Sequence, residues 1–137
     1  FIKGGWTTGE EKALKNLSPH ISWHSLGEGF TWETQDRIRD EKLVQEAWQL
    51  SKKYIKNESY RLIILDEINI ATKLGYLSSE EIITFLKSLN NRNNHIVLTG
   101  RGASDSIINY ADLVTEMKLI KHPFKEQGIK AQKCIEF

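Results

Sequence analysis

Hydrophobic positions recur along the chain in patterns that distinguish the expected helices from the expected strands. Residues 35–56 carry apolar or small side chains at three- and four-residue steps over the later turns, which predicts a long amphipathic helix. Two runs with continuously apolar centres, Leu62–Leu65 and His95–Thr99, predict strands buried on both faces of a parallel sheet. Further strands are expected at 21–26, where apolar and polar residues alternate, and at 113–117.

Helix starts are marked by Ser or Thr followed three residues later by Glu, the spacing of a capping box. This spacing occurs at Thr8 and at Ser78, and a shorter helical pattern follows later, so helices are expected over 8–17, 78–89 and 104–110. Strands that alternate with helices predict an α/β fold with a mostly parallel sheet, in which ligands bind beyond the carboxyl ends of the strands. The residues that follow each strand are therefore the candidates for function.

The composition indicates an ordinary globular protein and argues against several classes of partner. The 137 residues (15.8 kDa) suffice for one domain with a real core, and a net charge of +1 gives no strong field for nucleic acid or an anionic membrane. No apolar run approaches the roughly 18 residues of a membrane span, and no signal peptide is evident. Cys134 is the only cysteine, which excludes an intrachain disulfide. We expect a cytoplasmic protein.

Two adjacent carboxylates, Asp66 and Glu67, directly follow the apolar run Leu62–Leu65. Carboxylates at the mouth of a parallel sheet are costly unless water or a cation satisfies them. This is the Walker B arrangement, in which a carboxylate holds or orients Mg²⁺ on the phosphates of a nucleotide. The alternative is an acidic start to the next helix, which the helix dipole favours. The residues alone leave both interpretations open.

The second buried run ends in Thr99-Gly100-Arg101-Gly102. The glycines let the backbone approach a ligand closely, and the Arg101 guanidinium offers a planar fork of donors suited to phosphate. The alternative is an ion pair between Arg101 and a nearby carboxylate. Phe1-Ile2-Lys3 has the character of a strand end, so Lys3 is either a phosphate or carboxylate partner or a solvated edge charge. The phosphate-binding loop Gly-x-x-x-x-Gly-Lys-Ser/Thr does not occur in the sequence, and we expect it in a segment preceding Phe1.

Phe30 and Trp32 stand two residues apart, just after Gly29 and outside the preceding expected strand. Large apolar rings in a loop at a sheet edge are costly to expose unless they cover something. One interpretation is a flat apolar ligand. The other is a plug over the hydrophobic core, and the ring pair taken alone favours the plug.

Seven short strings, in this order along essentially the whole chain, resemble one protein family. They are Lys3-Gly4-x-Trp6-x-x-Gly9-Glu10, Gly29-Phe30-Thr31-Trp32-Glu33-Thr34-Gln35, Leu65-Asp66-Glu67, Thr99-Gly100-Arg101, Ala111-Asp112-x-Val114-Thr115-Glu116, Lys121-His122-Pro123-Phe124 and Gly128-Ile129-Lys130-Ala131-Gln132 with Ile135-Glu136. The family is the P-loop type of corrinoid adenosyltransferase, which acts on cob(I)alamin or cob(I)yrinic acid a,c-diamide. The Phe-Thr-Trp-Glu-Thr and Ala-Gln-x-x-Ile-Glu strings are far more specific than the Asp-Glu pair.

The resemblance implies a single adenosyltransferase domain over 1–137, with a RecA-like P-loop fold whose N-terminal strand and P-loop are missing from this chain. It also implies a homodimer. The implied reaction is attack of a Co(I) corrinoid on the 5′ carbon of ATP with release of triphosphate, in adenosylcobalamin biosynthesis or salvage. Mg²⁺ is the implied metal, with Mn²⁺ as the alternative, and a flavoprotein is a candidate reductant.

The resemblance also implies roles for individual residues. It places Phe30 and Trp32 under the corrin, where they exclude the lower axial ligand, which makes the cobalt four-coordinate and easier to reduce. Asp66 and Glu67 match the acidic pair of the family, with Glu67 as the carboxylate on the Mg²⁺ side. The protein supplies positioning and electrostatics, since the cobalt itself attacks. The expected contacts to the nucleotide are Lys3, Trp6 and Arg101.

Two departures from the family pattern keep alternatives open. The P-loop does not occur in this sequence, and Cys134 stands where the family usually has Gly. One alternative is a binding module that holds a corrinoid without transferring the adenosyl group. Another is a generic RecA-like ATPase, which leaves Phe30 and Trp32 unexplained.

Overall fold

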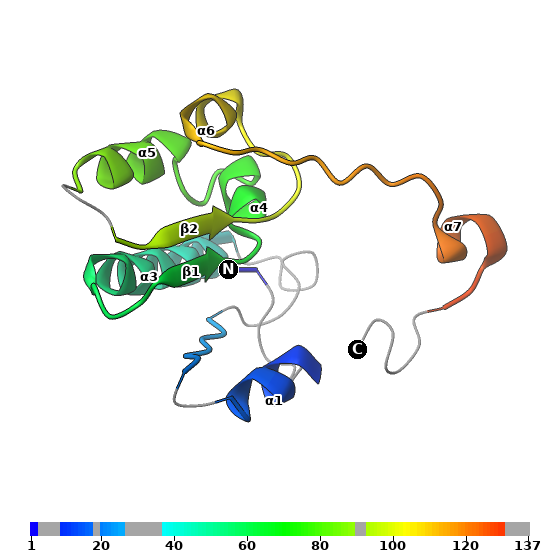
Figure 1. Cartoon of the computed structure of the whole chain (residues 1–137). Helices are drawn as coiled ribbons and strands as arrows, with labels where there is room; N and C mark the ends of the chain where they lie inside the picture. Colours follow the sequence, from blue (N-terminus) through cyan, green and yellow to red (C-terminus); the bar gives the residue numbers. More distant parts are fainter. Residues whose placement is uncertain (3–8, 18–19, 27–36, 90–92, 131–137) are drawn as a thin grey trace. The chain divides into compact units, whose positions relative to one another are not determined.

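The structure is a computed structural model that describes residues 1–2, 9–17, 20–26, 37–89 and 93–130. The chain divides into two compact units, one of residues 1–5 and 25–112 and the other of residues 6–24 and 113–137. The described elements of the first unit are α3 (Arg37–Lys56), β1 (Leu62–Leu65), α4 (Ile68–Lys73), α5 (Ser79–Lys87), β2 (His95–Leu98) and α6 (Asp105–Tyr110). Those of the second unit are α1 (Gly9–Lys15) and α7 (Pro123–Gln127) (Figure 1).

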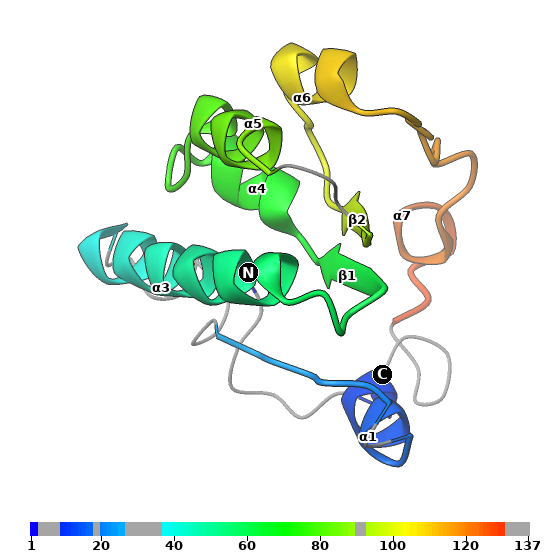
Figure 2. The same ribbon diagram turned by 60° about the vertical axis from the view of Figure 1, so that its left-hand side comes forward.

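Within the described residues of the first unit, β1 and β2 form a parallel pair, as the sequence predicts. Leu62 lies opposite His95 and Leu65 opposite Leu98, so the two strands end side by side. Between them the chain passes through α4 and α5, the helical crossover that parallel strands require. Helix α3 lies alongside β1, and α5 lies beside α6 (Figure 2). The predicted α/β class is confirmed.

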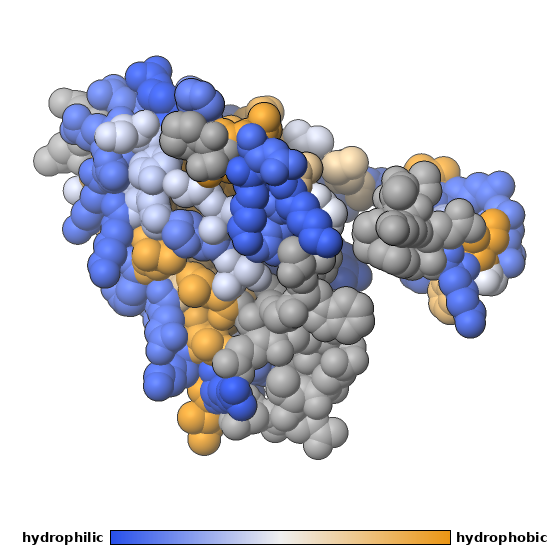
Figure 3. Space-filling model, turned by 90° about the horizontal axis from the view of Figure 1, so that it is seen from below, coloured by the Kyte–Doolittle hydropathy of each residue, from blue (hydrophilic) through white to orange (hydrophobic). Residues whose placement is uncertain are grey.

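The burial expected for the strands is wrong in one respect. Ile63 and Leu65 of β1 are buried in the core, but Leu62 and Ile64 are 54% and 58% exposed. Successive side chains of a strand point to opposite faces, and among the described residues only one face of this sheet is covered. Apolar side chains of β1 thus remain exposed. Figure 3 shows one face of the molecule, on which orange apolar patches lie among blue polar ones. The apolar run identifies the strand but not how many of its faces are covered.

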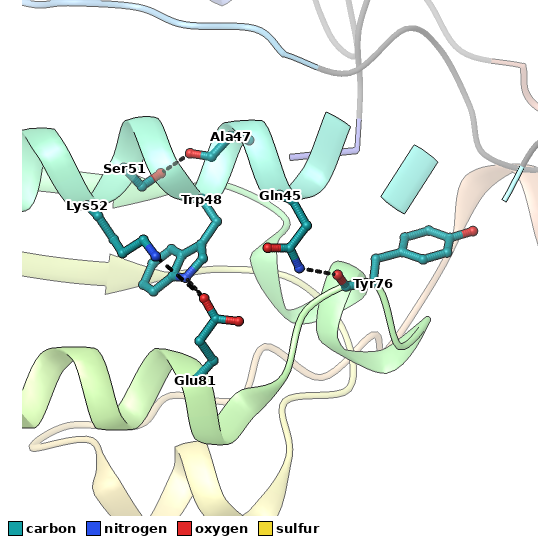
Figure 4. Close-up of polar contacts among 7 residues, drawn as sticks. All are labelled: Gln45, Ala47, Trp48, Ser51, Lys52, Tyr76 and Glu81. Atoms are coloured by element: carbon teal, nitrogen blue, oxygen red, sulfur yellow. Dashed lines mark hydrogen bonds and ion pairs between the residues drawn. The ribbon is translucent and has the colours of Figure 1, made fainter. Parts of the chain in front are cut away.

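The core is organised around Trp48 of α3, whose side chain is 0% exposed. Its ring meets Phe85 of α5 edge to face, with 5.4 Å between ring centroids. Its indole N–H donates to Glu81 Oε1 at 2.7 Å, and Lys52 Nζ lies 3.6 Å from the same oxygen (Figure 4). Gln45 Nε2 also donates to the Tyr76 carbonyl at 2.9 Å. These contacts hold α3 against α5 and against the turn that precedes it.

The predicted helix at 78–89 is confirmed as α5, but it starts with a simple N-cap and not with a capping box. Ser78 is the N-cap, and its hydroxyl accepts from the backbone N–H of Glu80 at 3.2 Å. The carboxylate of Glu81 binds Trp48 across the helix interface, as described above. The expected helices at 8–17 and 104–110 are also found, as α1 and α6. The N-cap of α6 is Ser104.

Two expected strands, at 21–26 and 113–117, are wrong. Both segments are described, and neither joins a ladder with another described strand. In the second, Leu113 and Met117 are among the most exposed apolar side chains of the described residues. Alternation or apolar content shows that a segment could pack as a strand, but a strand also needs a hydrogen-bonding neighbour.

Helix α7 was not expected, although its sequence carries the signals of a helix. His122 is the N-cap, Pro123 occupies the first turn, and Gly128 ends the helix with φ of 67°. Proline at the start and glycine just past the end is the asymmetry typical of helices.

Among the described residues, no helix has both the length and the apolar character needed to cross a membrane.

The expected strand end at 1–3 is described only for its first two residues. No strand is assigned to them, but the Phe1 nitrogen donates to the Asp66 carbonyl at 3.0 Å, and Ile2 is buried in the core. The start of the chain thus lies beside the end of β1. Lys3 lies outside the described residues.

Candidate functional site

The parallel register brings the residues after β1 and after β2 together at one edge of the sheet. The Thr99 hydroxyl donates to Asp66 Oδ1 at 2.7 Å and accepts from the backbone N–H of Glu67 at 2.9 Å. The backbone of Thr99 donates to the Leu65 carbonyl at 3.2 Å and accepts from the N–H of Asn69 at 3.1 Å. The acidic pair and the Thr-Gly-Arg-Gly segment, separated by over thirty residues, therefore form one site.

Glu67 has an unusual backbone conformation at this site. Its φ of 60° and ψ of 18° place it in the left-handed region, which is costly for a residue with a side chain. Glu67 is the N-cap of α4, but its side chain makes no capping hydrogen bond. Glu67 thus stands at the start of α4, as the interpretation of an acidic helix start expects, but its carboxylate does not cap the helix by a hydrogen bond.

The Glu67 carboxylate has an oxygen without a partner. Oε2 is buried and makes no hydrogen bond with any described residue. An unpaired buried carboxylate oxygen is expensive, and a divalent cation or a donor on a ligand would satisfy it. Mg²⁺ is bound through one or two carboxylates together with substrate phosphates, and Asp66 and Glu67 fit that donor set. No group of three or more His, Cys, Asp or Glu side chains in the described part of the chain could hold a metal alone.

Gly100 lies directly against Glu67, and the arrangement is possible because glycine has no side chain. A Cβ added at Gly100 would stand 3.1 Å from Glu67 Oε2 and 3.2 Å from Glu67 Cα, and the φ of Gly100 is +115°. Any side chain there would crowd the carboxylate as well as strain the backbone. The nearby Asn69 is only 5% exposed, and its Nδ2 donates to the Gly100 carbonyl at 3.5 Å. Its Oδ1, like Glu67 Oε2, has no hydrogen-bond partner among the described residues.

Arg101 stands one residue beyond Gly100, with its side chain exposed. The structure tests the alternative in which this guanidinium pairs with a neighbouring carboxylate. Among the described residues, Arg101 makes no ion pair with Asp66, Glu67 or Asp105. Its donors are therefore available to a ligand that binds beyond the strand ends.

Four residues expected at the site lie outside the part of the chain that the structure describes. They are Lys3, Trp6, Phe30 and Trp32. Thr99 and Asn69, in contrast, are site residues to which the sequence assigned no role. The available signal was that Thr99 directly follows the second buried strand, which parallel pairing brings beside the residues that follow the first strand.

Glu67→Gly is expected to raise the free energy of unfolding by about 0.5–1 kcal/mol, because glycine adopts the left-handed conformation without steric cost. The substitution also removes the unpaired buried oxygen. Urea denaturation measures the change. Glu80→Gly is the matched control: it lies in the first turn of α5, where glycine should lower the stability by up to about 1 kcal/mol. A loss of stability in Glu67→Gly would contradict the strain assigned to Glu67.

Comparison with known proteins identifies the family of the chain. Residues 1–137 match the sequence model of the family described as ATP:corrinoid adenosyltransferase BtuR/CobO/CobP. The chain belongs to this family, which confirms the resemblance seen in the sequence.

Several curated relatives carry the name corrinoid adenosyltransferase. The chain is 49% identical over 138 residues to one from Sinorhizobium sp and 46% identical over 137 residues to one from Pseudomonas aeruginosa. It is 36% identical over 140 residues to one from Escherichia coli K12. Each alignment covers 100% of this chain, but 64%, 66% and 68% of the respective relatives. The chain thus spans about two thirds of the length of the relatives it matches.

Proposed function

We propose that this chain is part of an enzyme that transfers the 5′-deoxyadenosyl group of ATP to the cobalt of a Co(I) corrinoid, in adenosylcobalamin biosynthesis or salvage. The observation that carries the proposal is the family match over residues 1–137. In the reaction, the cobalt electron pair forms a bond to C5′, the C5′–O bond breaks, and its electron pair leaves with triphosphate. Residues 1–137 then form one domain of a RecA-like fold that works as a homodimer.

In this proposal Glu67 and Asp66 hold Mg²⁺ on the triphosphate of ATP. Support comes from the buried, unpaired Oε2 of Glu67 and from the family's acidic pair, which these residues match. When bound, Mg²⁺ (or Mn²⁺) stabilises the negative charge that develops on the leaving triphosphate. Asp66 contributes less directly, because the Thr99 hydroxyl already occupies its Oδ1.

Arg101 is proposed to contact a phosphate or the ribose. Its exposed guanidinium is on the same edge of the sheet as the acidic pair and is not committed to a neighbouring carboxylate. Lys3 and Trp6 are proposed as further nucleotide contacts on the strength of the sequence strings alone. Together these groups would orient the C5′ carbon for attack, and orientation is a large part of what such an enzyme supplies.

Phe30 and Trp32 are proposed to lie under the corrin and to displace its lower axial ligand. Phe30→Ala and Trp32→Ala should slow adenosylation that starts from a Co(II) corrinoid under a mild reductant by at least about tenfold, or about 1.4 kcal/mol in the barrier. ATP affinity should change much less, since neither ring is assigned to the nucleotide. The measurement is the initial rate of product formation beside ATP binding by calorimetry. Wild-type rates in both variants would remove this assignment.

The function itself is tested with the protein expressed from its complete reading frame. The corrinoid spectrum is followed without oxygen after Co(I) corrinoid and MgATP are mixed with the protein. Growth of the light-sensitive adenosylcorrinoid spectrum, with one triphosphate per product, supports the transferase. A shift of the bound corrinoid spectrum without product would indicate a binding module. Phosphate release that does not depend on corrinoid would indicate a generic ATPase.

A further inference from the structure

Thr99 makes hydrogen bonds to the turn that joins β1 to α4 with its side chain as well as with its backbone. A residue that only ends a strand needs no side-chain hydrogen bonds of this kind. Its backbone N–H and carbonyl bind the Leu65 carbonyl and the Asn69 N–H, at 3.2 and 3.1 Å. Its hydroxyl binds Asp66 Oδ1 and the Glu67 N–H, at 2.7 and 2.9 Å. Thr99 therefore contacts almost every residue of the turn from the end of β1 to the start of α4.

We propose that Thr99 is a positioning residue that sets the geometry of the acidic pair, Asp66 and Glu67, for the metal–nucleotide complex. This inference rests on the proposed function. The hydroxyl proton is used by Asp66, and one of the oxygen's lone pairs is used by Glu67. Thr99 thus acts through the two carboxylates rather than by touching the substrate.

The Thr99 hydroxyl orients each of the two carboxylates in a different way. It holds Asp66 directly, by a charge-assisted hydrogen bond to Oδ1 that fixes which carboxylate oxygen remains available. It holds Glu67 indirectly, because it anchors the N–H of a residue whose left-handed backbone turns toward Gly100. Partners that orient metal ligands in this way often control metal affinity as strongly as the ligands themselves do.

The alternative is that Thr99 only fastens the two strand ends together. Its two backbone hydrogen bonds would serve that purpose in any variant, because they do not depend on the side chain. Thr99→Val keeps the branched shape and both backbone bonds but removes the hydroxyl. Thr99→Ser keeps the hydroxyl and loses only a methyl group. The comparison of these two variants isolates the two hydroxyl hydrogen bonds.

The experiment uses the protein expressed from its complete reading frame and measures the Mg²⁺ dependence of adenosylation at fixed ATP and corrinoid. It also measures the Mg²⁺ dependence of ATP binding by calorimetry without corrinoid, where no transfer takes place. In Thr99→Val the Mg²⁺ concentrations for half-maximal rate and for half-maximal ATP binding should each rise by about tenfold or more, the usual effect of losing an orienting partner of a metal ligand. The KM for the corrinoid should stay within about twofold of wild type, since no corrinoid contact is assigned to Thr99. Thr99→Ser should restore a Mg²⁺ dependence close to that of wild type.

Thr84→Val is the matched control, because Thr84 lies on the exposed side of α5 and loses the same hydroxyl. It should leave the Mg²⁺ dependence unchanged. If Thr99→Val does not fold, Thr99→Cys replaces it, since a thiol is only a weak hydrogen-bond donor, and its Mg²⁺ requirement should again exceed that of Thr99→Ser.

The outcomes separate this inference from the proposed function. A wild-type protein that adenosylates the corrinoid with Mg²⁺, and a Thr99→Val or Thr99→Cys variant with the same Mg²⁺ dependence, would overturn the role of Thr99 alone. An equal rise in the Mg²⁺ requirement and in the corrinoid KM would also overturn it, because a general structural defect has that effect. A wild-type protein that forms no adenosylcorrinoid would overturn both proposals.

Discussion

Glu67→Gln is expected to lower the rate of the proposed Mg²⁺-dependent adenosyl transfer by about 100-fold, or roughly 2.7 kcal/mol in the barrier, while the protein stays folded. The amide is nearly the same size as the carboxylate, so the tight fit against Gly100 is kept. What changes is the charge on a buried oxygen that has no other partner among the described residues. Initial rates at saturating ATP and corrinoid, over a range of Mg²⁺ concentrations, measure the effect.

Two further substitutions make this result specific. Glu58→Gln removes the same charge from an exposed turn before β1 and should leave the rate unchanged. Asp66→Asn should have a smaller effect than Glu67→Gln, because the Thr99 hydroxyl already binds one oxygen of Asp66. If Glu67→Gln and wild type had equal rates, Glu67 would not be the carboxylate on the metal side, and its strained backbone would need another explanation.

The sequence predicts that the residues after the two strands meet at one edge of the sheet, because this arrangement depends on two apolar runs. Each run identifies a strand, and parallel pairing then requires the residues after Leu65 and Leu98 to meet at one edge. That reasoning places Asp66, Glu67 and Arg101 together without any knowledge of side-chain contacts. It gives no role to Thr99, because the direction of a hydroxyl depends on the register of the strands, which the sequence does not determine.

The left-handed conformation of Glu67 could not be predicted for a related reason. Glutamate has no preference for that region, and local sequence normally places glycine or asparagine there. The conformation is consistent with the hydrogen bond from the Glu67 N–H to Thr99 and with the absence of a side chain at Gly100, which lies directly against Glu67. Strain that persists against local preference is often found at functional sites, and here it occurs at the carboxylate proposed to face the metal.

Glu81 shows how tertiary packing overrides a local pattern. Its spacing from Ser78 predicts a reciprocal capping box, and Ser78 does cap α5. The Glu81 carboxylate instead accepts from the indole of Trp48, a residue more than thirty positions earlier in the chain. A buried indole N–H needs an acceptor, and leaving it unpaired costs more free energy than a hydrogen bond from Glu81 to the N-cap backbone would gain. At an exposed helix start, water can take the place of that hydrogen bond. The helix is predictable from sequence, but this use of its carboxylate is not.

Trp48→Ala is expected to lower the free energy of unfolding by about 3–5 kcal/mol, the usual cost of removing a fully buried tryptophan. Trp48 is 0% exposed, its ring contacts Phe85, and its N–H binds Glu81. The loss is a large fraction of the roughly 5–15 kcal/mol that stabilises an ordinary domain. Urea denaturation followed by far-ultraviolet circular dichroism measures it.

Two variants separate the parts of this effect. Glu81→Ala removes the hydrogen-bond acceptor but keeps the ring, and should cost about 1 kcal/mol, with little added by the Lys52 ion pair, which is partly exposed. Ile38→Ala removes an apolar side chain from the same helix α3, but that side chain is 83% exposed, so its loss should change the stability by less than about 0.5 kcal/mol. A cost for Trp48→Ala as small as that of Ile38→Ala would mean that α3 is not held to α5 through this ring. The position of α3 beside β1 would then need another source of stability.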